Sequence, residues 1–144
     1  MRQTTSANQP PPTVFVVDDD DFSCEVMSEM LKVEGVTDVS CAGSAHEALR
    51  ILAGLKNTPD IMICDVFMPD MDGIEFMNTL ARQGYAGAVV LVSGVSEQTL
   101  SLAHDIAVGG GILLLGTFTK PLRPNALAAM LAKWRGLAEA KQGT

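Results

Sequence analysis

Short runs of apolar residues recur along the chain at intervals typical of buried strands. The run Val14–Val17 is continuous, as expected of a strand that is covered on both faces of a sheet. The run from Val36 to Cys41 is less apolar, so we expect it near an edge. Together these runs predict strands over residues 14–17, 36–41, 60–64, 88–93 and 112–117.

Between the strands, apolar residues follow the repeat of an α-helix. In the first such segment, four of them share one helix face: Phe22, Val26, Met30 and Val33. Gly35 follows as a stop signal, and the pair Ser44 and Glu47 forms a capping box for the next helix. Asp72 and Ser96 are further candidate N-caps. The pattern predicts helices over residues 22–34, 44–55, 73–83, 96–108 and 124–138.

Five strands that alternate with five helices over short connections are typical of a parallel sheet built from βαβ units. Right-handed crossovers then put helices on both faces of the sheet, which is a doubly wound α/β fold. The 144 residues suffice for one such domain. We expect it over residues 13–138, after a flexible leader at 1–12 that plays no part in the fold and before a tail or linker start at 139–144.

Composition narrows the class of protein. Hydrophobic residues make up 47% of the chain and charged residues 19%, which supports a packed interior. The net charge of −7 argues against direct nucleic-acid binding, which needs clustered Lys and Arg. No stretch reaches the roughly 20 apolar residues of a transmembrane helix. The polar N-terminus lacks the apolar segment of a signal peptide, so we expect a cytoplasmic protein without membrane contact.

The three cysteines, Cys24, Cys41 and Cys64, are an odd number without the short spacing of metal ligands. Each lies in an apolar or helical context, so we expect reduced, buried thiols. His46 and His104 have no acid at metal-ligand spacing, and we expect them on the surface or in packing contacts.

Polar side chains stand at the carboxyl ends of four predicted strands. The run Asp18–Asp21 follows the first strand, and Asp65 follows the third. Ser93 ends the fourth strand, and Lys120 comes after the fifth. In a doubly wound sheet these ends lie along one edge, where ligands bind. We therefore expect carboxylates, a hydroxyl and an amine to converge there.

This combination suits a metal-assisted transfer of a phosphoryl group. Clustered carboxylates repel one another, and a hard cation such as Mg²⁺, which prefers oxygen ligands, offsets that repulsion. With the metal bound, Asp65 could attack phosphorus as a nucleophile. Ser93 and Lys120 could then hold other oxygens of the transferred group.

Each feature alone has an ordinary structural explanation. The acidic run could be a solvated loop in which Asp20 or Asp21 caps a helix. Asp65 could be a turn residue, Ser93 a cap and Lys120 a surface lysine. Their joint occurrence after apolar strands, in the right order, favours the functional interpretation.

The motifs at these strand ends resemble the receiver domain of two-component response regulators. They are VFVVDDDD at 14–21, IMICDVFMPDMDGIEF at 61–76, VVLVSG at 89–94 and TFTKPL at 117–122. The resemblance covers roughly residues 13–138. It implies a flavodoxin-like (βα)5 fold with strand order 2-1-3-4-5.

The resemblance also implies roles for single residues. Asp65 is then the phosphoacceptor, Ser93 the switch hydroxyl and Lys120 the residue that pairs with the phosphoryl group. Pro121 is expected to follow a cis peptide bond.

For the metal, the resemblance implies Mg²⁺ bound by an acidic pair together with Asp65. Asp19 is then a direct ligand, and Asp18 acts mainly through a water. The backbone carbonyl of Phe67 is expected to be a further ligand.

Two features depart from the usual receiver pattern. Receivers commonly carry Phe or Tyr three residues before the lysine as a rotamer switch, where this chain has Thr117. Phe118 is adjacent, but the period of two in a strand points it to the opposite side. The segment from Ser93 to Lys120 is also longer than in common receivers, and the form GTFTKPL is similar to that of receivers attached to cyclic-di-GMP phosphodiesterase (EAL) domains.

The resemblance implies a phosphorelay. A sensor histidine kinase or phosphotransfer protein presents phosphohistidine, and Asp65 accepts the phosphoryl group. The face made by helix 96–108, strand 112–117 and helix 124–138 then changes its affinity for an output domain or a second copy of the chain. Such a chain is no enzyme beyond its own phosphorylation and dephosphorylation.

Two other functions stay open on the residues alone. A phosphatase of the haloacid dehalogenase type could use Mg²⁺ with Asp18 and Asp20, but this leaves Asp65 and the MPDMDG segment without a role. A pseudo-receiver, which is an interaction module that is never phosphorylated, leaves the complete set of reactive groups unused.

We predict that phosphorylated Asp65 hydrolyses slowly. The residues two positions beyond Asp65 and Ser93 are Phe67 and Val95, and neither side chain can orient an attacking water. Loss of the phosphoryl group from the purified protein, followed by mass spectrometry, should take minutes or longer. A half-life of only seconds would contradict the prediction.

Overall fold

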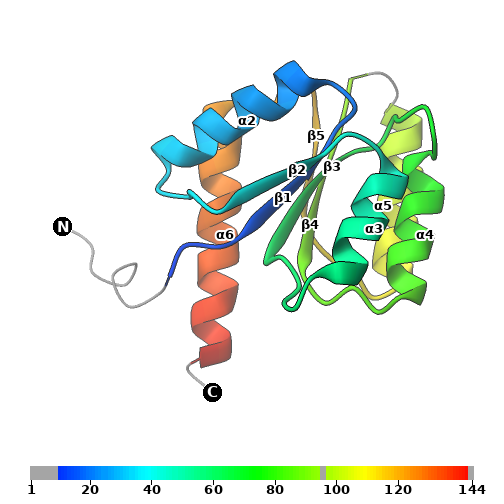
Figure 1. Cartoon of the computed structure of the whole chain (residues 1–144). Helices are drawn as coiled ribbons and strands as arrows, with labels where there is room; N and C mark the ends of the chain where they lie inside the picture. Colours follow the sequence, from blue (N-terminus) through cyan, green and yellow to red (C-terminus); the bar gives the residue numbers. More distant parts are fainter. Residues whose placement is uncertain (1–9, 95–96, 143–144) are drawn as a thin grey trace.

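The computed structural model describes residues 10–94 and 97–142 of the chain. Five parallel strands form one sheet in the order β2-β1-β3-β4-β5 (Figure 1), which confirms the predicted flavodoxin-like (βα)5 fold and strand order 2-1-3-4-5. The strands are β1 Val14–Val17, β2 Val39–Ala42, β3 Ile61–Asp65, β4 Ala88–Ser93 and β5 Leu113–Thr119. The helices are α2 Asp21–Val33, α3 Ala45–Gly54, α4 Gly73–Arg82, α5 Glu97–Gly109 and α6 Pro124–Gln142.

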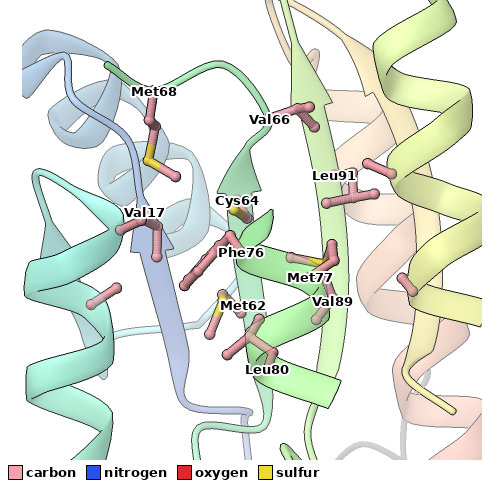
Figure 2. Close-up of a cluster of buried hydrophobic side chains, with 14 of the residues drawn as sticks. Val17, Met62, Cys64, Val66, Met68, Phe76, Met77, Leu80, Val89 and Leu91 are labelled. Atoms are coloured by element: carbon pink, nitrogen blue, oxygen red, sulfur yellow. The ribbon is translucent and has the colours of Figure 1, made fainter. Parts of the chain in front are cut away.

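The helices form two layers, with α2 and α6 on one face of the sheet and α3, α4 and α5 on the other (Figure 1). Because side chains alternate along a strand, β1 sends Val14 and Val16 into the core under α2 and α6, and Phe15 and Val17 into the opposite core. Figure 2 shows the second core, where Phe76, Met77 and Leu80 of α4 lie over β3 and β4. No helix within the described ranges combines the length and apolar character needed to cross a membrane.

The end of α2 explains why β2 is shorter than predicted. Gly35 has φ +86°, and its N–H and that of Val36 donate to the carbonyls of Lys32 and Leu31, respectively. These two bonds form a Schellman motif, which caps the last carbonyls of a helix. Val36 is therefore buried as part of the helix end, and the strand predicted over 36–41 is observed only at Val39–Ala42.

Several other boundaries differ from the predictions. The last helix continues to Gln142 instead of ending near residue 138, because no Gly or Pro occurs in the segment AEAKQ. β5 reaches Thr119, two residues beyond its predicted end. At the N-terminus Pro12 is buried, so the last residue of the predicted leader belongs to the fold. Residues 1–9 of that leader, and the predicted cap Ser96, lie outside the described residues.

The apolar stripe that predicted α2 is not its buried face. Phe22, Val26 and Val33 are 71%, 40% and 85% exposed, and the fourth residue of the stripe, Met30, is partly buried against the core. The core instead receives three residues of an adjacent face: Cys24, Met27 and Leu31. Both sets have helical spacing, so the sequence identifies the helix, whereas contact with β1, β2 and α6 decides which face is buried.

The prediction of three reduced, buried cysteines is wrong for two of them. Cys24 of α2 and Cys41 of β2 form a disulfide, with Cα atoms 6.5 Å apart, and Cys41 is exposed. That separation is within the range for disulfide-bonded cysteines. The pairing depends on how α2 packs beside β2, which a separation of 17 residues does not indicate. Cys64 is free and buried, as predicted.

We predict that Gly73→Ala destabilises the fold by about 1–3 kcal/mol, the usual cost of overpacking. A Cβ at Gly73, the first residue of α4, would lie 2.6 Å from a Val66 side-chain carbon and 2.8 Å from the Val66 backbone. The backbone cannot move away easily, since the Gly73 N–H donates to the Val66 carbonyl at 2.7 Å.

Gly136→Ala in α6 is the matched control. It meets no atom within 4 Å, and it should stabilise the helix by about 0.5–1 kcal/mol because alanine is the better helix former. Urea unfolding of both variants measures the difference. Equal stabilities would contradict the tight contact at Gly73.

Candidate functional site

The carboxyl ends of four strands meet at one edge, as the sequence predicts, and backbone bonds hold them in register. Val17 pairs with Cys64, so the next residues, Asp18 and Asp65, lie side by side. Asp65 in turn pairs with Val92, next to Ser93. The Lys120 N–H donates to the Ser93 carbonyl at 2.9 Å, which fixes the start of the segment after β5.

Lys120 joins the two buried carboxylates. Its Nζ donates to Asp18 Oδ2 and to Asp65 Oδ2, at 2.9 Å each. Both acids are almost fully buried, at 5% and 6% exposure, whereas the lysine side chain is 28% exposed. The lysine is thus more accessible to solvent than the two acids, so a bound ligand could also contact its ammonium group.

Asp19 adds a third carboxylate. Asp18, Asp19 and Asp65 each offer an oxygen, and these atoms lie within 4.8 Å of one another. Asp19 is exposed and the other two are buried, so the group opens to solvent on one side. Three convergent carboxylate oxygens fit a hard divalent cation such as Mg²⁺, which takes several oxygen ligands and keeps some of its water.

The protonation of the site follows from burial and from these hydrogen bonds. Burial raises the pKa of Asp65 above its usual value, and hydrogen bonds from the Phe67 N–H and Lys120 oppose that rise only in part. For Lys120, burial lowers the pKa, but the bonds to Asp18 and Asp65 outweigh it and give a net increase. The lysine is therefore kept charged, while the charge on Asp65 is costly.

Phe67 and Ser93 complete the set of predicted site residues. The Phe67 N–H donates to Asp65 Oδ1 at 3.0 Å, and its side chain is 61% exposed. Ser93 is 2% exposed at the end of β4. The structure therefore brings the side chains of four predicted site residues together: Asp18, Asp19, Asp65 and Lys120. Phe67 joins them through its backbone N–H, and Ser93 lies next to them because of the strand register. Val95 lies outside the described residues.

Two local predictions about this edge are confirmed. The peptide bond between Lys120 and Pro121 is cis. Asp20 is the N-cap of α2, since its carboxylate accepts a hydrogen bond from the Phe22 N–H at 3.1 Å. Asp18 also orders this turn, because its Oδ1 accepts from the Asp20 N–H at 2.9 Å.

The predicted orientations of Thr117 and Phe118 are also confirmed. Thr117 pairs with Leu91, whose side chain lies in the core under α3–α5, and it lines a hollow with Leu100 and His104 of α5. Phe118 packs in the opposite core, under α2 and α6. A register shift between β4 and β5, at Val89 and Val90, sets this arrangement.

Asp70 is a candidate functional residue that the sequence reasoning missed. It lies between β3 and α4 and accepts hydrogen bonds from the Ala45 N–H at 3.3 Å and the His46 N–H at 3.0 Å. His46 Nδ1 lies 2.7 Å from Asp70 Oδ2. Burial raises the pKa of Asp70, but the bonds from His46 and Ala45 outweigh it and lower the pKa overall.

These bonds tie the loop after Asp65 to the start of α3. His46 is exposed, as expected, but it has this acid as a partner. The partners of Asp70 are more than 20 residues away in the chain, so local spacing does not indicate this contact. The local signal that Asp70 has a role was its position in the MPDMDG segment.

We predict that Asp65→Asn makes the magnesium-free protein more stable at pH 7, with a rise in Tm on the order of 3 °C. The pKa of Asp65 is raised by folding, so the native state loses stability as the pH rises from the ordinary carboxyl range through the raised pKa. Asparagine removes this cost without changing the size of the side chain.

The difference should disappear at low pH, where Asp65 is protonated in both the folded and unfolded states. Thermal unfolding in EDTA across the pH range measures it. Asp105→Asn, at an exposed position of α5, is the control and should leave Tm unchanged. A lower Tm for Asp65→Asn at pH 7 would mean that the bond to Lys120 outweighs burial.

Comparison with known proteins identifies the family of this chain. Residues 14–132 match the family described as the response regulator receiver domain. Over 79% of its length the chain is 34% identical to the two-component response regulator ARR11 of Arabidopsis thaliana, and it covers 20% of that protein. It is 34% identical, over 82% of its length, to protein-glutamate methylesterase/protein-glutamine glutaminase 5 of Myxococcus xanthus, of which it covers 32%.

Among solved structures, a response regulator from Colwellia psychrerythraea is similar to 88% of this chain and 98% of its own, with 30% identity and a TM-score of 0.72. The chain thus spans most of a receiver structure but less than a third of the two full-length relatives. The match does not favour a phosphatase of the haloacid dehalogenase type or a pseudo-receiver. The chain belongs to the receiver domain family of two-component response regulators.

Proposed function

We propose that this receiver domain accepts a phosphoryl group on Asp65 and passes the signal on through a change of its surface. The observation that carries the proposal is the contact of one lysine, Lys120, with two buried carboxylates, Asp18 and Asp65, at 2.9 Å each. A structural ion pair needs only one acid, whereas a second buried acid adds a repulsion that a bound cation would relieve.

Mg²⁺ fits the residues present. Two like charges whose oxygens lie within 4.8 Å repel by about 3–4 kcal/mol at an effective dielectric of about 20. We assign Asp19 and Asp65 as direct ligands, with the Phe67 carbonyl, and Asp18 as a ligand mainly through water. When bound, Mg²⁺ would neutralise charge on the incoming phosphoryl group and share one of its oxygens.

The residues of the chain then divide the work of the transfer. A carboxylate oxygen of Asp65 attacks phosphorus, and the bond from phosphorus to the donor imidazole breaks. The imidazole nitrogen keeps the electron pair and takes up a proton from water. Lys120 moves its hydrogen bond from Asp65 to a phosphoryl oxygen, and the Ser93 hydroxyl donates to another. The Phe67 N–H holds the other Asp65 oxygen in place at 3.0 Å.

A hollow beside Asp65 offers the donor an approach. It has a volume of about 170 Å³ and is bounded by Asp65, Lys120 and Pro121, and by the exposed face of α2 with Phe22 and Val26. Exposed apolar side chains next to a reactive group favour contact with a protein over a free small molecule. We therefore assign a sensor histidine kinase or a phosphotransfer protein as the donor, in the cytoplasm.

The signal would leave the site through α5, β5 and α6. A shift of Ser93 at the end of β4 would repack this face and change its affinity for an output domain or a second copy of the chain. Thr117 stands where receivers commonly carry an aromatic switch. In this chain Thr117 instead lines a hollow with Leu100 and His104. The output domain could be tethered to the receiver, and the sequence suggests an EAL domain as one such type.

In this proposal the chain does not catalyse a reaction on other molecules. The methylesterase/glutaminase activities in the name of the Myxococcus relative describe a protein of which this chain covers 32%. Within the described residues, the convergent reactive groups are those around Asp65, and they support phosphorylation of the domain itself.

The test is phosphorylation by acetyl phosphate, read by intact-protein mass spectrometry. We expect one added phosphoryl group on the wild type with Mg²⁺ and none with EDTA. Asp65→Asn should abolish the addition because the nucleophile is lost, and the exposed control Asp105→Asn should retain it.

Three results would contradict the proposal. Phosphorylation of Asp65→Asn would mean that another residue is the acceptor. If phosphorylation is lost in Asp18→Asn but kept in Asp65→Asn, an acid at the end of the first strand would be the nucleophile. No phosphorylation and no Mg²⁺ binding by the wild type would favour a pure interaction module.

A further inference from the structure

Hydrogen bonds connect the disulfide between Cys24 and Cys41 to the acidic residues of the site. The Cys24 N–H donates to the carbonyl of Asp20, and the Asp20 N–H donates to Asp18 Oδ1. On the other side, the Asp18 N–H donates to the carbonyl of Ala42, the residue after Cys41. Both ends of the disulfide are thus one or two hydrogen bonds away from Asp18.

This arrangement makes the disulfide a clamp on the acidic turn. The turn over residues 18–20 runs from β1 to α2, and hydrogen bonds attach it to β2 and to the first turn of α2. The covalent link joins the same two elements, α2 and β2. Closing the link restricts their relative motion and therefore the positions open to Asp18 and Asp19.

The two sulfur atoms differ in access. Cys41 is exposed, and the Ser28 hydroxyl lies 4.0 Å from its sulfur. Cys24 is only 8% exposed. An exposed thiol beside a more buried one is a typical pair of a peroxide-reactive and a resolving cysteine.

Cys64 contrasts with this pair. It is fully buried in β3, and burial raises its pKa, with the nearby carboxylates of Asp65 and Asp18 adding to the rise. It therefore stays a protonated thiol out of reach of oxidants.

We propose that Cys24 and Cys41 are a reversible oxidation site, and that their disulfide strengthens Mg²⁺ binding at the phosphorylation site. In reducing compartments, disulfides are commonly transient and redox-sensing, which fits a pair with one exposed member. Oxidation holds the acidic turn in its metal-binding arrangement, and reduction frees it to sample others. This inference rests on the proposed function, because it concerns the metal of that same site.

The chemistry balances with a peroxide as oxidant and a dithiol as reductant. The Cys41 thiol loses its proton, and the thiolate takes a hydroxyl group from the peroxide to form a sulfenic acid. The other peroxide oxygen leaves with that proton as water or an alcohol. The Cys24 sulfur then attacks Cys41, and the hydroxyl departs with the Cys24 proton as water. A dithiol returns two electrons and two protons through a mixed disulfide and becomes a disulfide itself.

The experiment compares the oxidised and reduced forms of the full chain. Treatment with hydrogen peroxide, then with dithiothreitol, is followed by intact mass and by peptide mapping of the Cys24–Cys41 link. Calorimetric titration with Mg²⁺ should give a Kd about two- to threefold lower for the oxidised form, as expected if the reduced turn is competent in about a third to a half of molecules. Hydrogen exchange at the amide of Asp20 should be slower in the oxidised form.

Two variants keep the comparison specific. Cys41→Ser should show the Kd of the reduced form under both conditions. Cys64→Ala removes the buried thiol that lies outside the pair, and it should keep the difference between the two forms.

The inference would be overturned if peroxide does not link Cys24 to Cys41. It would also be overturned if dithiothreitol cannot open the link in the folded protein, or if the link forms without a change in Kd. Acetyl phosphate separates it from the proposed function. Phosphorylation of both forms with equal Mg²⁺ affinity contradicts only the redox inference, whereas no phosphorylation of either form contradicts the proposed function.

Discussion

The contact of Lys120 with Asp18 and Asp65 is the interaction on which the site depends. Two carboxylates buried at 5% and 6% exposure would repel strongly without a cation between them. One ammonium group, shared between them at 2.9 Å each, makes the arrangement tolerable while leaving negative charge in excess. In the proposed function, that excess of negative charge attracts the metal ion, and the mobility of a lysine side chain lets the same ammonium bind the phosphoryl group later.

The sheet is arranged so that these three residues meet. Asp18 and Asp65 follow paired residues of β1 and β3, and the backbone of Lys120 is tied to Ser93 of β4. The loop after Asp65 is held at two points, by the hydrogen bonds of Asp70 to the start of α3 and by the close contact of Gly73 with Val66. A reactive carboxylate is thus positioned mainly by backbone hydrogen bonds, which tolerate changes in the surrounding side chains.

One helix, α2, connects several properties of the molecule. Its N-terminus begins in the acidic turn, with Asp20 as cap. Its exposed face carries Phe22 and Val26 beside the hollow that leads to Asp65. Its buried face carries Cys24, which is bonded to β2. The proposed metal binding, the proposed donor contact and the disulfide therefore all involve the same helix, so a change at one of them should affect the others.

The sequence by itself determined the alternation of strands and helices, the caps Ser44 and Asp72, and the strand-end residues of the candidate site, because each depends on local periodicity or on chain order. It left open which face of α2 is buried, where β2 begins, and the partners of Cys24 and Asp70. Those depend on contacts between elements distant in the chain, such as Cys24 with Cys41 and Asp70 with His46. Only the tertiary structure decided these features, because residue spacing indicates which residues share a helix or strand but not which helices and strands contact each other.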